Sequence, residues 1–398
     1  MKKPMINSRE FNVLHCMDTY LNITENWMLN IIRAAPGIRN IITALEFNNN
    51  FPLYEDIRYW KPKRAFHRSN KIRHLIENKI FVLLRQIHIL LNKGKFDLIH
   101  CHFATVGCAN RKLAKFLKKP LVVSFYGYDY EAYPNRFPAY HAHYQRLFRQ
   151  ADLFLCEGHY GASVLVKKGC PANKVMVCRL GVKAKTIPFV QRKKAPGELR
   201  LVQVARFTEK KGHVVALKSF IEALKKCPNM HLTLVGELPG EATAKDDPSQ
   251  KIKTRLLELI KLHSIEDKVS FKPLVPIKEL HESLTPHHIF IHHSVWTSDG
   301  ESEGGAPVVL LDAQATGMPI IASKHCDIPD EVIDDKTGIL CEEGNVKETS
   351  LAIERFYEMG QQEFDQFALN GRHHVEQNYD IENNGKVLAE AYNKAIKK

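Results

Sequence analysis

No run of apolar residues in this sequence approaches the length of about 20 that a membrane-spanning helix requires. The nine cysteines include no C-x-x-C pair, and their odd number and scattered positions indicate reduced thiols rather than a disulfide framework. No apolar core follows the basic N-terminal residues, as it would in a secretory signal. The sequence also has no internal repeat and no low-complexity segment. These absences predict a globular protein of the cytoplasm.

Acidic residues are scarce in the first half of the chain. Residues 1–190 contain 30 Lys and Arg against 12 Asp and Glu, whereas residues 191–398 contain 27 against 32. The basic residues are densest at 58–73. Such an excess favours an anionic partner, such as a membrane surface, a lipid diphosphate or a nucleic acid, or it is a solvated face that maintains solubility. The aromatic–basic interleaving of RNA-binding sheets is missing, so we expect no nucleic acid partner.

Short apolar runs alternate with segments of helical spacing in both halves of the chain. This alternation indicates βαβ units and parallel sheets, and therefore an α/β protein with two doubly wound lobes. The predicted strands are 11–17, 41–44, 98–101, 120–125 and 153–156 in the first half, and 199–205, 231–235, 269–273, 289–292 and 320–323 in the second. The predicted helices are 27–34, 75–92, 109–117, 213–226, 251–263, 277–283 and 307–316.

The organisation along the chain follows from a polar segment near its middle. Residues 186–198 are polar, contain two prolines and show no periodicity, which indicates a linker. We therefore expect a first lobe at 1–185 and a second lobe at 199–375. Residues 361–396 have helical spacing throughout, and we expect the helix at 376–398 to stand apart from the second lobe.

Residues 301–321, ESEGGAPVVLLDAQATGMPII, have the character of a ligand site. Glycines at the start of a helix let an anion approach bare backbone N–H groups, which the helix dipole also favours. The nearby carboxylates of Glu301, Glu303 and Asp312 suit sugar and ribose hydroxyls. The segment thus predicts a sugar-nucleotide site; the alternative is a capped helix with solvated acids.

A second candidate site follows the first predicted strand of the second lobe. Arg206, Lys210 and Lys211 come directly after LRLVQVA and before a predicted helix. Two cations at a strand end can clamp a diphosphate. The alternative is a basic surface loop.

Both segments resemble the donor-site motifs of family-4 retaining glycosyltransferases, which have the GT-B fold. The likeness is to members that build exopolysaccharides such as colanic acid and amylovoran. The family motif is usually Glu, seven residues and Glu, whereas here eight residues separate Glu303 from Asp312. By this resemblance, Glu303 is a catalytic residue that holds donor sugar hydroxyls, and Asp312 holds the ribose. Glu301 remains an alternative to Glu303.

The resemblance extends to the residues around these acids. Arg206 and Lys211 would hold the donor diphosphate, with Lys210 as an alternative to Lys211. The remaining donor-binding candidates are Gly304, Gly305, Ala306 and Pro307.

Two loops of the first half also resemble the family. Thr24 and Glu25 match an acceptor-side segment, although Thr24 equally suits a helix cap. His100 and His102, in DLIHCHF, alternate on one face of a strand, and a structural role as core histidines is favoured over a functional one.

A third resembling loop is SFYGYD at 124–129. Many relatives have His before this Gly, in contact with the donor sugar near the reacting centre, whereas this chain has Tyr126. Tyr126 and Asp129 are the implied catalytic candidates, and Gly127 and Glu157 the acceptor-side ones. The missing His indicates a subgroup, a different donor or a degenerate transferase.

As a whole, the resemblance implies a GT-B fold with two Rossmann-like lobes facing a central cleft and a C-terminal helix that crosses back to the first lobe. It implies a retaining, metal-independent transfer from a UDP- or GDP-sugar, with no cofactor, to a lipid-linked or saccharide acceptor. The basic lobe would rest on the anionic inner face of the plasma membrane. The alternatives are transfer to a soluble small molecule and a catalytically degenerate sugar-nucleotide binder. The His-rich run at 287–293 has no partner at ligand spacing, so we expect no metal.

Overall fold

The computed structural model describes residues 10–20, 26–47, 53–61, 71–237 and 248–397. The chain divides into two compact units. The N-terminal unit comprises Met1–Leu180 and Ile381–Lys398, and the C-terminal unit comprises Gly181–Asp380. Within the described ranges, no helix is both long enough and apolar enough to cross a membrane.

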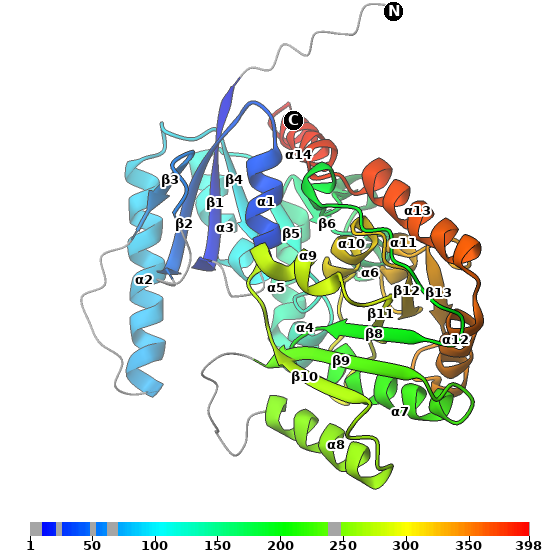
Figure 1. Cartoon of the computed structure of the whole chain (residues 1–398). Coiled ribbons are helices and arrows are strands. Elements are labelled where there is room, and N and C mark those ends of the chain that lie inside the picture. Colours follow the sequence, from blue (N-terminus) through cyan, green and yellow to red (C-terminus); the bar gives the residue numbers. More distant parts are fainter. Residues whose placement is uncertain (1–9, 21–25, 48–52, 62–70, 238–247, 398) are drawn as a thin grey trace, which may run out of the picture. The chain divides into compact units, whose positions relative to one another are not determined.

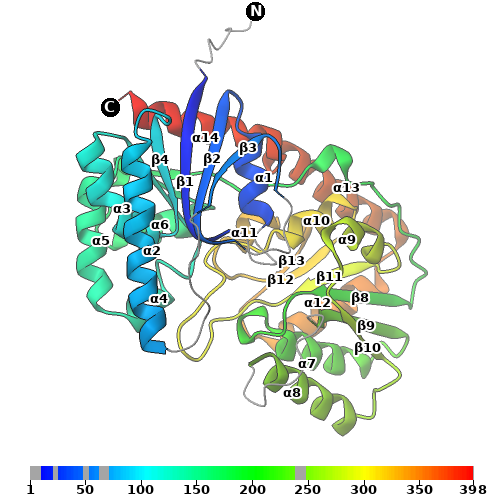
Figure 2. The ribbon, with the colours of Figure 1, turned by 90° about the vertical axis from the view of Figure 1, so that its left-hand side faces the viewer.

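The N-terminal unit is built on one seven-stranded sheet of order β3-β2-β1-β4-β5-β6-β7, in which all neighbours are parallel (Figure 1). Helices cover both faces, as a parallel sheet requires. Helices α1 and α14 lie together on one face, and α2, α3 and α5 on the other (Figure 2). The strands are β1 (Phe11–Tyr20), β2 (Ile38–Phe47), β3 (Ile57–Trp60), β4 (Leu98–His102), β5 (Leu121–Phe125), β6 (Leu153–Cys156) and β7 (Val175–Val177). The helices are α1 (Asn26–Ala34), α2 (Lys71–Leu91), α3 (Ala104–Leu117), α4 (Ala132–Arg136), α5 (Ala139–Gln150), α6 (His159–Lys167) and α14 (Ile381–Ile396).

The C-terminal unit repeats this architecture with a six-stranded parallel sheet of order β10-β9-β8-β11-β12-β13. The strands are β8 (Leu199–Val204), β9 (Met230–Glu237), β10 (Val269–Pro273), β11 (Ile289–His292), β12 (Ile320–Ser323) and β13 (Gly338–Cys341). The helices are α7 (His213–Leu224), α8 (Pro248–Leu262), α9 (Ile277–Leu284), α10 (Val309–Ala315), α11 (Ile328–Glu331), α12 (Val346–Glu358) and α13 (Gln361–Asn378).

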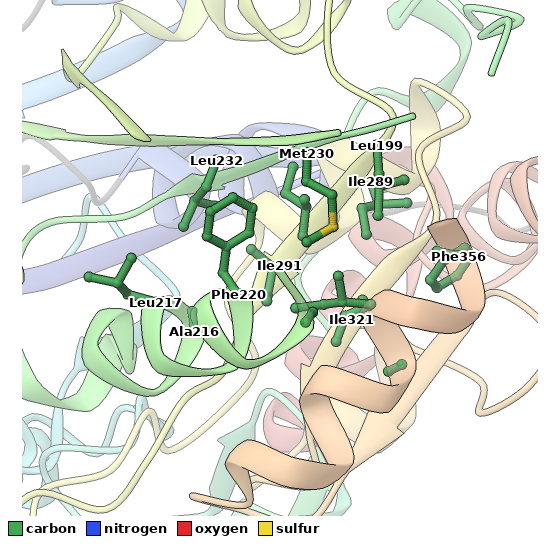
Figure 3. Packing of buried hydrophobic residues seen from close by; sticks show 14 of the residues in the cluster. Leu199, Ala216, Leu217, Phe220, Met230, Leu232, Ile289, Ile291, Ile321 and Phe356 are labelled. Atoms are coloured by element: carbon green, nitrogen blue, oxygen red, sulfur yellow. The ribbon is translucent and has the colours of Figure 1, made fainter. Parts of the chain in front are cut away.

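The larger core of this unit lies between α7 and the sheet. Leu217 and Phe220 come from one face of α7 and point toward Leu232 of β9 and Ile291 of β11 (Figure 3). Phe220 is fully buried. Burying a side chain of this size stabilises the fold by about 1.5–3 kcal/mol relative to exposure, so α7 is firmly fixed to the sheet.

The predicted strands are all present, and their ends agree within three residues. Three strands, β3, β7 and β13, were not predicted, and each is a short strand at the edge of its sheet. The tail predicted to be helical throughout is two helices, α13 and α14. It breaks because the Tyr379 carbonyl accepts the Val182 N–H and Asp380 pairs with Val182 as an isolated bridge.

The segment 186–198, which we expected to be a linker, is fixed to the C-terminal unit by two buried cations. The Arg192 guanidinium donates to the carbonyls of His287 and Thr316, both at 2.7 Å. The Lys194 ammonium donates to the carbonyls of Tyr357 and Met359, both at 2.9 Å. Thr316 and Met359 are the C-caps of α10 and α12, where carbonyls lack helical partners and cations are favoured. The polar composition therefore reflects helix capping, and the units divide at 180/181 rather than near 185.

Each sheet has one point where the direction of strand addition reverses. It lies between β1 and β4 in the N-terminal unit and between β8 and β11 in the C-terminal unit. Loops leaving the carboxyl ends of such neighbouring strands diverge, and ligands of open α/β sheets bind there. These two places are where the site residues of each unit should be sought.

A chain of buried polar side chains crosses the first of these places. His15 of β1 lies opposite His100 of β4 in the register, and His102 follows on the same face. Asn40 donates its Nδ2 to the Ile32 carbonyl, so its Oδ1 must accept from His15 Nε2 at 3.0 Å. His15 Nδ1 therefore carries no proton, and it accepts a hydrogen bond from His102 Nε2, also at 3.0 Å. The geometry thus fixes the neutral tautomers of both rings.

All three histidines should make stability depend on pH. Burial lowers the pKa of His15 to about 4 and holds the pKa of His100 and His102 well below the usual value near 6.5. Between pH 6.5 and the folded values, the unfolded chain binds protons that the folded chain does not. The free energy of unfolding should therefore fall as pH is lowered from 7 to 5, by up to about 1.4 kcal/mol per pH unit for each histidine.

Urea unfolding at a series of pH values measures this slope. His15→Gln should reduce it, whereas His141→Gln, at an exposed position of α5, should leave it unchanged. Equal slopes for wild type and His15→Gln, together with a similar result for His102→Gln, would contradict the burial account.

Candidate functional site

The loops that follow β8 and β11 approach one another closely at Gly212. This residue has a φ of 64°, and a Cβ there would lie 1.6 Å from the His293 carbonyl oxygen. Only glycine fits such a contact. The Val295 N–H also donates to the Lys210 carbonyl at 3.0 Å. The loop at 206–212 is therefore fixed against the segment that leaves β11.

This contact brings Lys211 and Glu303 together as a largely buried ion pair. Lys211 Nζ lies 2.7 Å from Glu303 Oε2, and the two side chains are 17% and 7% exposed. The Gln203 side chain donates to the Lys211 carbonyl at 2.7 Å and fixes its backbone. On the other side, Ser294 Oγ donates to Glu303 Oε1 at 3.2 Å, and His292 Nε2 lies 3.8 Å from the same oxygen.

Electrostatics keep the Glu303 carboxylate ionised. Burial acts to raise its pKa, but Lys211, with smaller contributions from His292 and Lys210, outweighs burial and holds the pKa well below its usual range. A carboxylate that stays charged in a largely buried site is a strong acceptor for hydroxyl groups.

A second pair lies beside the first, between Lys210 Nζ and Glu301 Oε1 at 2.6 Å. Its side chains are more exposed, at 18% and 30%. The sequence left open which lysine and which acid bind the donor. The structure places both lysines and both acids side by side, and Lys211–Glu303 is the more buried pair. Arg206 is exposed, and no ion pair of its guanidinium is recorded within the described ranges.

The glycine run lies further from its helix than expected. Helix α10 begins at Val309, not at residue 307, and it has seven residues. Gly304 and Gly305 are buried in the preceding loop, where Gly304 has a φ of 79°. The extra residue of the motif is thus accommodated in the loop, together with Ala306 and Pro307, and the glycines themselves do not start the helix.

Asp312 lies in the first turn of α10 and faces α9. Its Oδ1 accepts a hydrogen bond from His281 Nε2 at 2.8 Å, and the residue is 6% exposed. Burial raises the pKa of Asp312, and His281 opposes this shift. The contact of Asp312 with a ribose stays a prediction.

Sequence reasoning missed a histidine in the loop after β12 that supports Glu303. His325 Nε2 accepts the Glu303 N–H at 3.1 Å, so its Nδ1 carries the proton and donates to Glu343 Oε2 at 2.8 Å. His325 is therefore a neutral imidazole that orients the backbone at Glu303. The sequence feature that could have identified His325 is its position just after β12, a strand that neighbours β11.

In the N-terminal unit, Asp129 organises the turn that carries Tyr126. Its Oδ1 accepts the Tyr126 N–H at 2.9 Å, and its Oδ2 accepts the N–H of Ala104, the first residue of α3, at 2.8 Å. Gly127 turns the chain with a φ of 94°. Burial raises the pKa of Asp129 to about 7, against these backbone bonds. The bonds give Asp129 a structural role, and its catalytic role stays a prediction.

The Tyr126 hydroxyl completes the buried histidine chain. It lies 2.7 Å from His102 Nδ1, the unprotonated nitrogen of that ring, and therefore donates a hydrogen bond to it. The phenol oxygen keeps its lone pairs for other donors. The Tyr126 ring stacks on His102 and packs against Trp27 with ring centroids 4.8 Å apart.

A pocket of the N-terminal unit opens beside this hydroxyl. Apolar side chains of α1, β6 and α14 line much of it. Its polar lining comes from His100, His102, Ser124, Tyr126 and Glu157. The pocket thus joins Tyr126 and Glu157, two residues that the sequence singled out. Thr24 and Glu25 lie outside the described residues.

The three buried histidines are also the one group, within the described residues, whose ligand atoms lie close enough to hold a metal ion. All six ring nitrogens have hydrogen-bond partners, since His100 bonds to Tyr392 and Ser124 at 2.8 Å each. Hydrogen bonding alone accounts for this cluster.

Two family models match consecutive parts of the chain. The model of Glycosyltransferase Family 4 matches residues 37–185, and that of Glycosyl transferases group 1 matches residues 185–374. The second match contains the Lys211–Glu303 pair, and the first contains Tyr126 and most of the residues that line its pocket.

Two curated relatives are named for polysaccharide biosynthesis. WcaL of Escherichia coli K12, whose name assigns it as a glycosyltransferase to colanic acid biosynthesis, is 27% identical over 329 residues, which are 82% of this chain and 78% of WcaL. The amylovoran biosynthesis glycosyltransferase AmsK of Erwinia amylovora is 30% identical over 269 residues, 67% of this chain and 63% of AmsK.

Solved structures share the fold at low identity. HepE of Anabaena, in complex with UDP and glucose, aligns over 96% of this chain and 99% of its own, with a TM-score of 0.72 and 15% identity. Sucrose-phosphate synthase of Thermosynechococcus elongatus aligns over 96% and 98%, with a TM-score of 0.77 and 15% identity. Two parallel-sheet units and these neighbours identify the fold as GT-B, and the chain belongs to the glycosyltransferases that join a Family 4 domain to a group 1 domain.

Proposed function

We propose that this protein is a retaining glycosyltransferase that moves a sugar from a nucleoside diphosphate sugar to a lipid-linked or saccharide acceptor in exopolysaccharide synthesis. The observation that carries the proposal is the largely buried Lys211–Glu303 pair between the loops of β8 and β11. The names of WcaL and AmsK support the polymer, and the UDP bound in HepE supports a UDP-sugar as donor, with a GDP-sugar as the alternative.

The pair suits a donor because its two groups have complementary tasks. The Lys211 ammonium has three donors, and Glu303 uses one of them, so a phosphate oxygen can bind the same nitrogen without breaking the pair. The exposed Arg206 guanidinium supplies a second cation for the diphosphate. The Glu303 carboxylate, kept ionised, accepts hydroxyls of the donor sugar.

These groups also fit the transfer itself. When the bond between the anomeric carbon and the diphosphate breaks, its electron pair goes to the leaving oxygen, and fixed cations stabilise that charge without a metal. The acceptor hydroxyl forms the new bond on the same face, and its proton goes to the departing diphosphate. We assign Tyr126 a role in orienting a hydroxyl of the substrate, because its oxygen can accept a hydrogen bond in the pocket.

The acceptor side is supported by charge. The basic first half of the chain suits the diphosphate of a lipid-linked sugar and an anionic membrane surface. We therefore propose a cytoplasmic protein that associates with the inner face of the plasma membrane.

Nucleotide binding tests the donor site. In a thermal-shift panel of UDP, GDP, ADP and CDP without metal, one nucleotide should raise the melting temperature of the protein. Lys211→Met should weaken its affinity about 10–100-fold, because a charge-assisted hydrogen bond contributes about 1.5–3 kcal/mol. Lys225→Met, at an exposed lysine of the same unit, should bind like wild type.

The double variant Lys211→Met/Glu303→Gln separates binding from folding, since it leaves no unpaired buried charge. Restored melting temperature without restored affinity is the expected result. Wild-type affinity in either variant, or no binding of any nucleotide by the wild type, would contradict the donor site.

The configuration of the released sugar tests retention. With the sugar nucleotide that binds, and water in place of the acceptor, proton NMR at early times should show the anomer present in the donor. Glu303→Gln should lower the rate of release at least about 100-fold, as expected for the loss of a group aimed at the reacting sugar. The opposite anomer as first product would contradict a retaining reaction, and binding without release would favour a degenerate transferase.

A further inference from the structure

Helix α2 of the N-terminal unit is apolar on two opposite sides. One side packs on the sheet through Phe81 and Ile89, which are buried, and through Arg85, whose guanidinium donates to the Met17 carbonyl at 2.9 Å. The opposite side exposes five aliphatic side chains, with exposed fractions between 43% and 78%. We call them the α2 stripe: Ile80, Leu83, Leu84, Ile87 and Leu91.

The spacing of the α2 stripe is that of one helix face. With 3.6 residues per turn, these five positions fall within an arc of about 100°. Isolated exposed leucines need no explanation, but a contiguous aliphatic face on a surface helix marks an interaction site. The α2 stripe therefore has the character of an interaction surface.

The neighbouring helix extends this surface. Gln86 of α2 donates to the Ala109 carbonyl of α3 at 2.9 Å, so the two helices lie side by side (Figure 2). Helix α3 exposes Phe116 at 73%, next to the exposed Lys112 and Lys115. Apolar and cationic side chains are thus presented from the same face of the sheet.

The charge around the α2 stripe is predominantly positive. Residues 80–119 contain eight Lys and Arg and a single acidic residue, Asp97. Aliphatic side chains bordered by lysines are typical of helices that lie in the surface of an anionic membrane. A second copy of this chain fits less well, because pairing the same surface would bring like charges together.

We propose that the α2 stripe enters the interfacial layer of an anionic bilayer, with the lysines of α3 at the level of the lipid headgroups. This inference rests on the membrane association proposed above and assigns it to one face of one helix. It is independent of the donor chemistry, because the α2 stripe and Lys211 belong to different units.

Vesicle cosedimentation tests the α2 stripe. The wild type should bind vesicles of phosphatidylcholine with phosphatidylglycerol, and bind vesicles of phosphatidylcholine alone more weakly. Leu83→Gln/Leu91→Gln should reduce binding at least about tenfold, because two aliphatic side chains lose their favourable transfer from water. Leu257→Gln/Leu262→Gln is the matched control, since these leucines of α8 are 47% and 74% exposed, close to the 56% and 78% of Leu83 and Leu91.

Two further variants separate insertion from charge. Lys112→Gln/Lys115→Gln should weaken binding to anionic vesicles and reduce its dependence on salt. In Leu83→Trp, brominated acyl chains should quench the added fluorescence, whereas in Leu257→Trp they should not.

The proposal is overturned if the leucine variant of α2 binds vesicles like its control, or if the wild type binds no vesicles. It is also overturned if light scattering shows a dimer that Leu83→Gln/Leu91→Gln converts to a monomer, because the α2 stripe would then be an interface between copies. Nucleotide binding measured on the same samples distinguishes failure of this proposal from failure of the donor site.

Discussion

The contact of Gly212 with the His293 carbonyl is the constraint on which the candidate donor site depends. It fixes the loop after β8 against the chain leaving β11, at the point where strand order reverses. Lys211 precedes this contact directly, and Glu303 belongs to the segment that follows it. A parallel sheet supplies the position, but only a residue without Cβ lets the two loops approach closely enough for a direct ion pair.

Charge pairing against burial then determines the ionisation of this site. A lysine and a glutamate with little exposure would each be costly alone, and together they hold each other ionised. The supporting bonds come from β8, through Gln203, and from the loops after β11 and β12, through Ser294 and His325. In the N-terminal unit, neutral histidines orient the Tyr126 hydroxyl through hydrogen bonds, because burial disfavours their protonation. One unit thus presents fixed charge and the other a fixed hydrogen-bond direction.

Sequence reasoning identified what depends on local pattern. Most strands were predicted because buried parallel strands are continuous apolar runs. Lys211 was singled out because it follows such a strand, Glu303 because it precedes a glycine run, and Tyr126 by resemblance. It missed what depends on distant partners. Arg192 and Lys194 were assigned to a linker, since nothing local shows that they cap α10 and α12. The tautomers of His15 and His102, the partner of Asp312 and the support from His325 all arise from contacts between segments that are distant in the sequence, which a single sequence does not display.

The most direct test of the central claim is the affinity of Gly212→Ala for the nucleotide that the wild type binds. The added Cβ should displace the loop, separate Lys211 from Glu303 and weaken binding at least about 100-fold, while the far-ultraviolet circular dichroism stays that of a folded protein. Gly197→Ala is the matched control: it has a similar φ of 79°, but the nearest atom to its Cβ would be 3.7 Å away. If both variants bind like the wild type, the close approach of the two loops does not create the site.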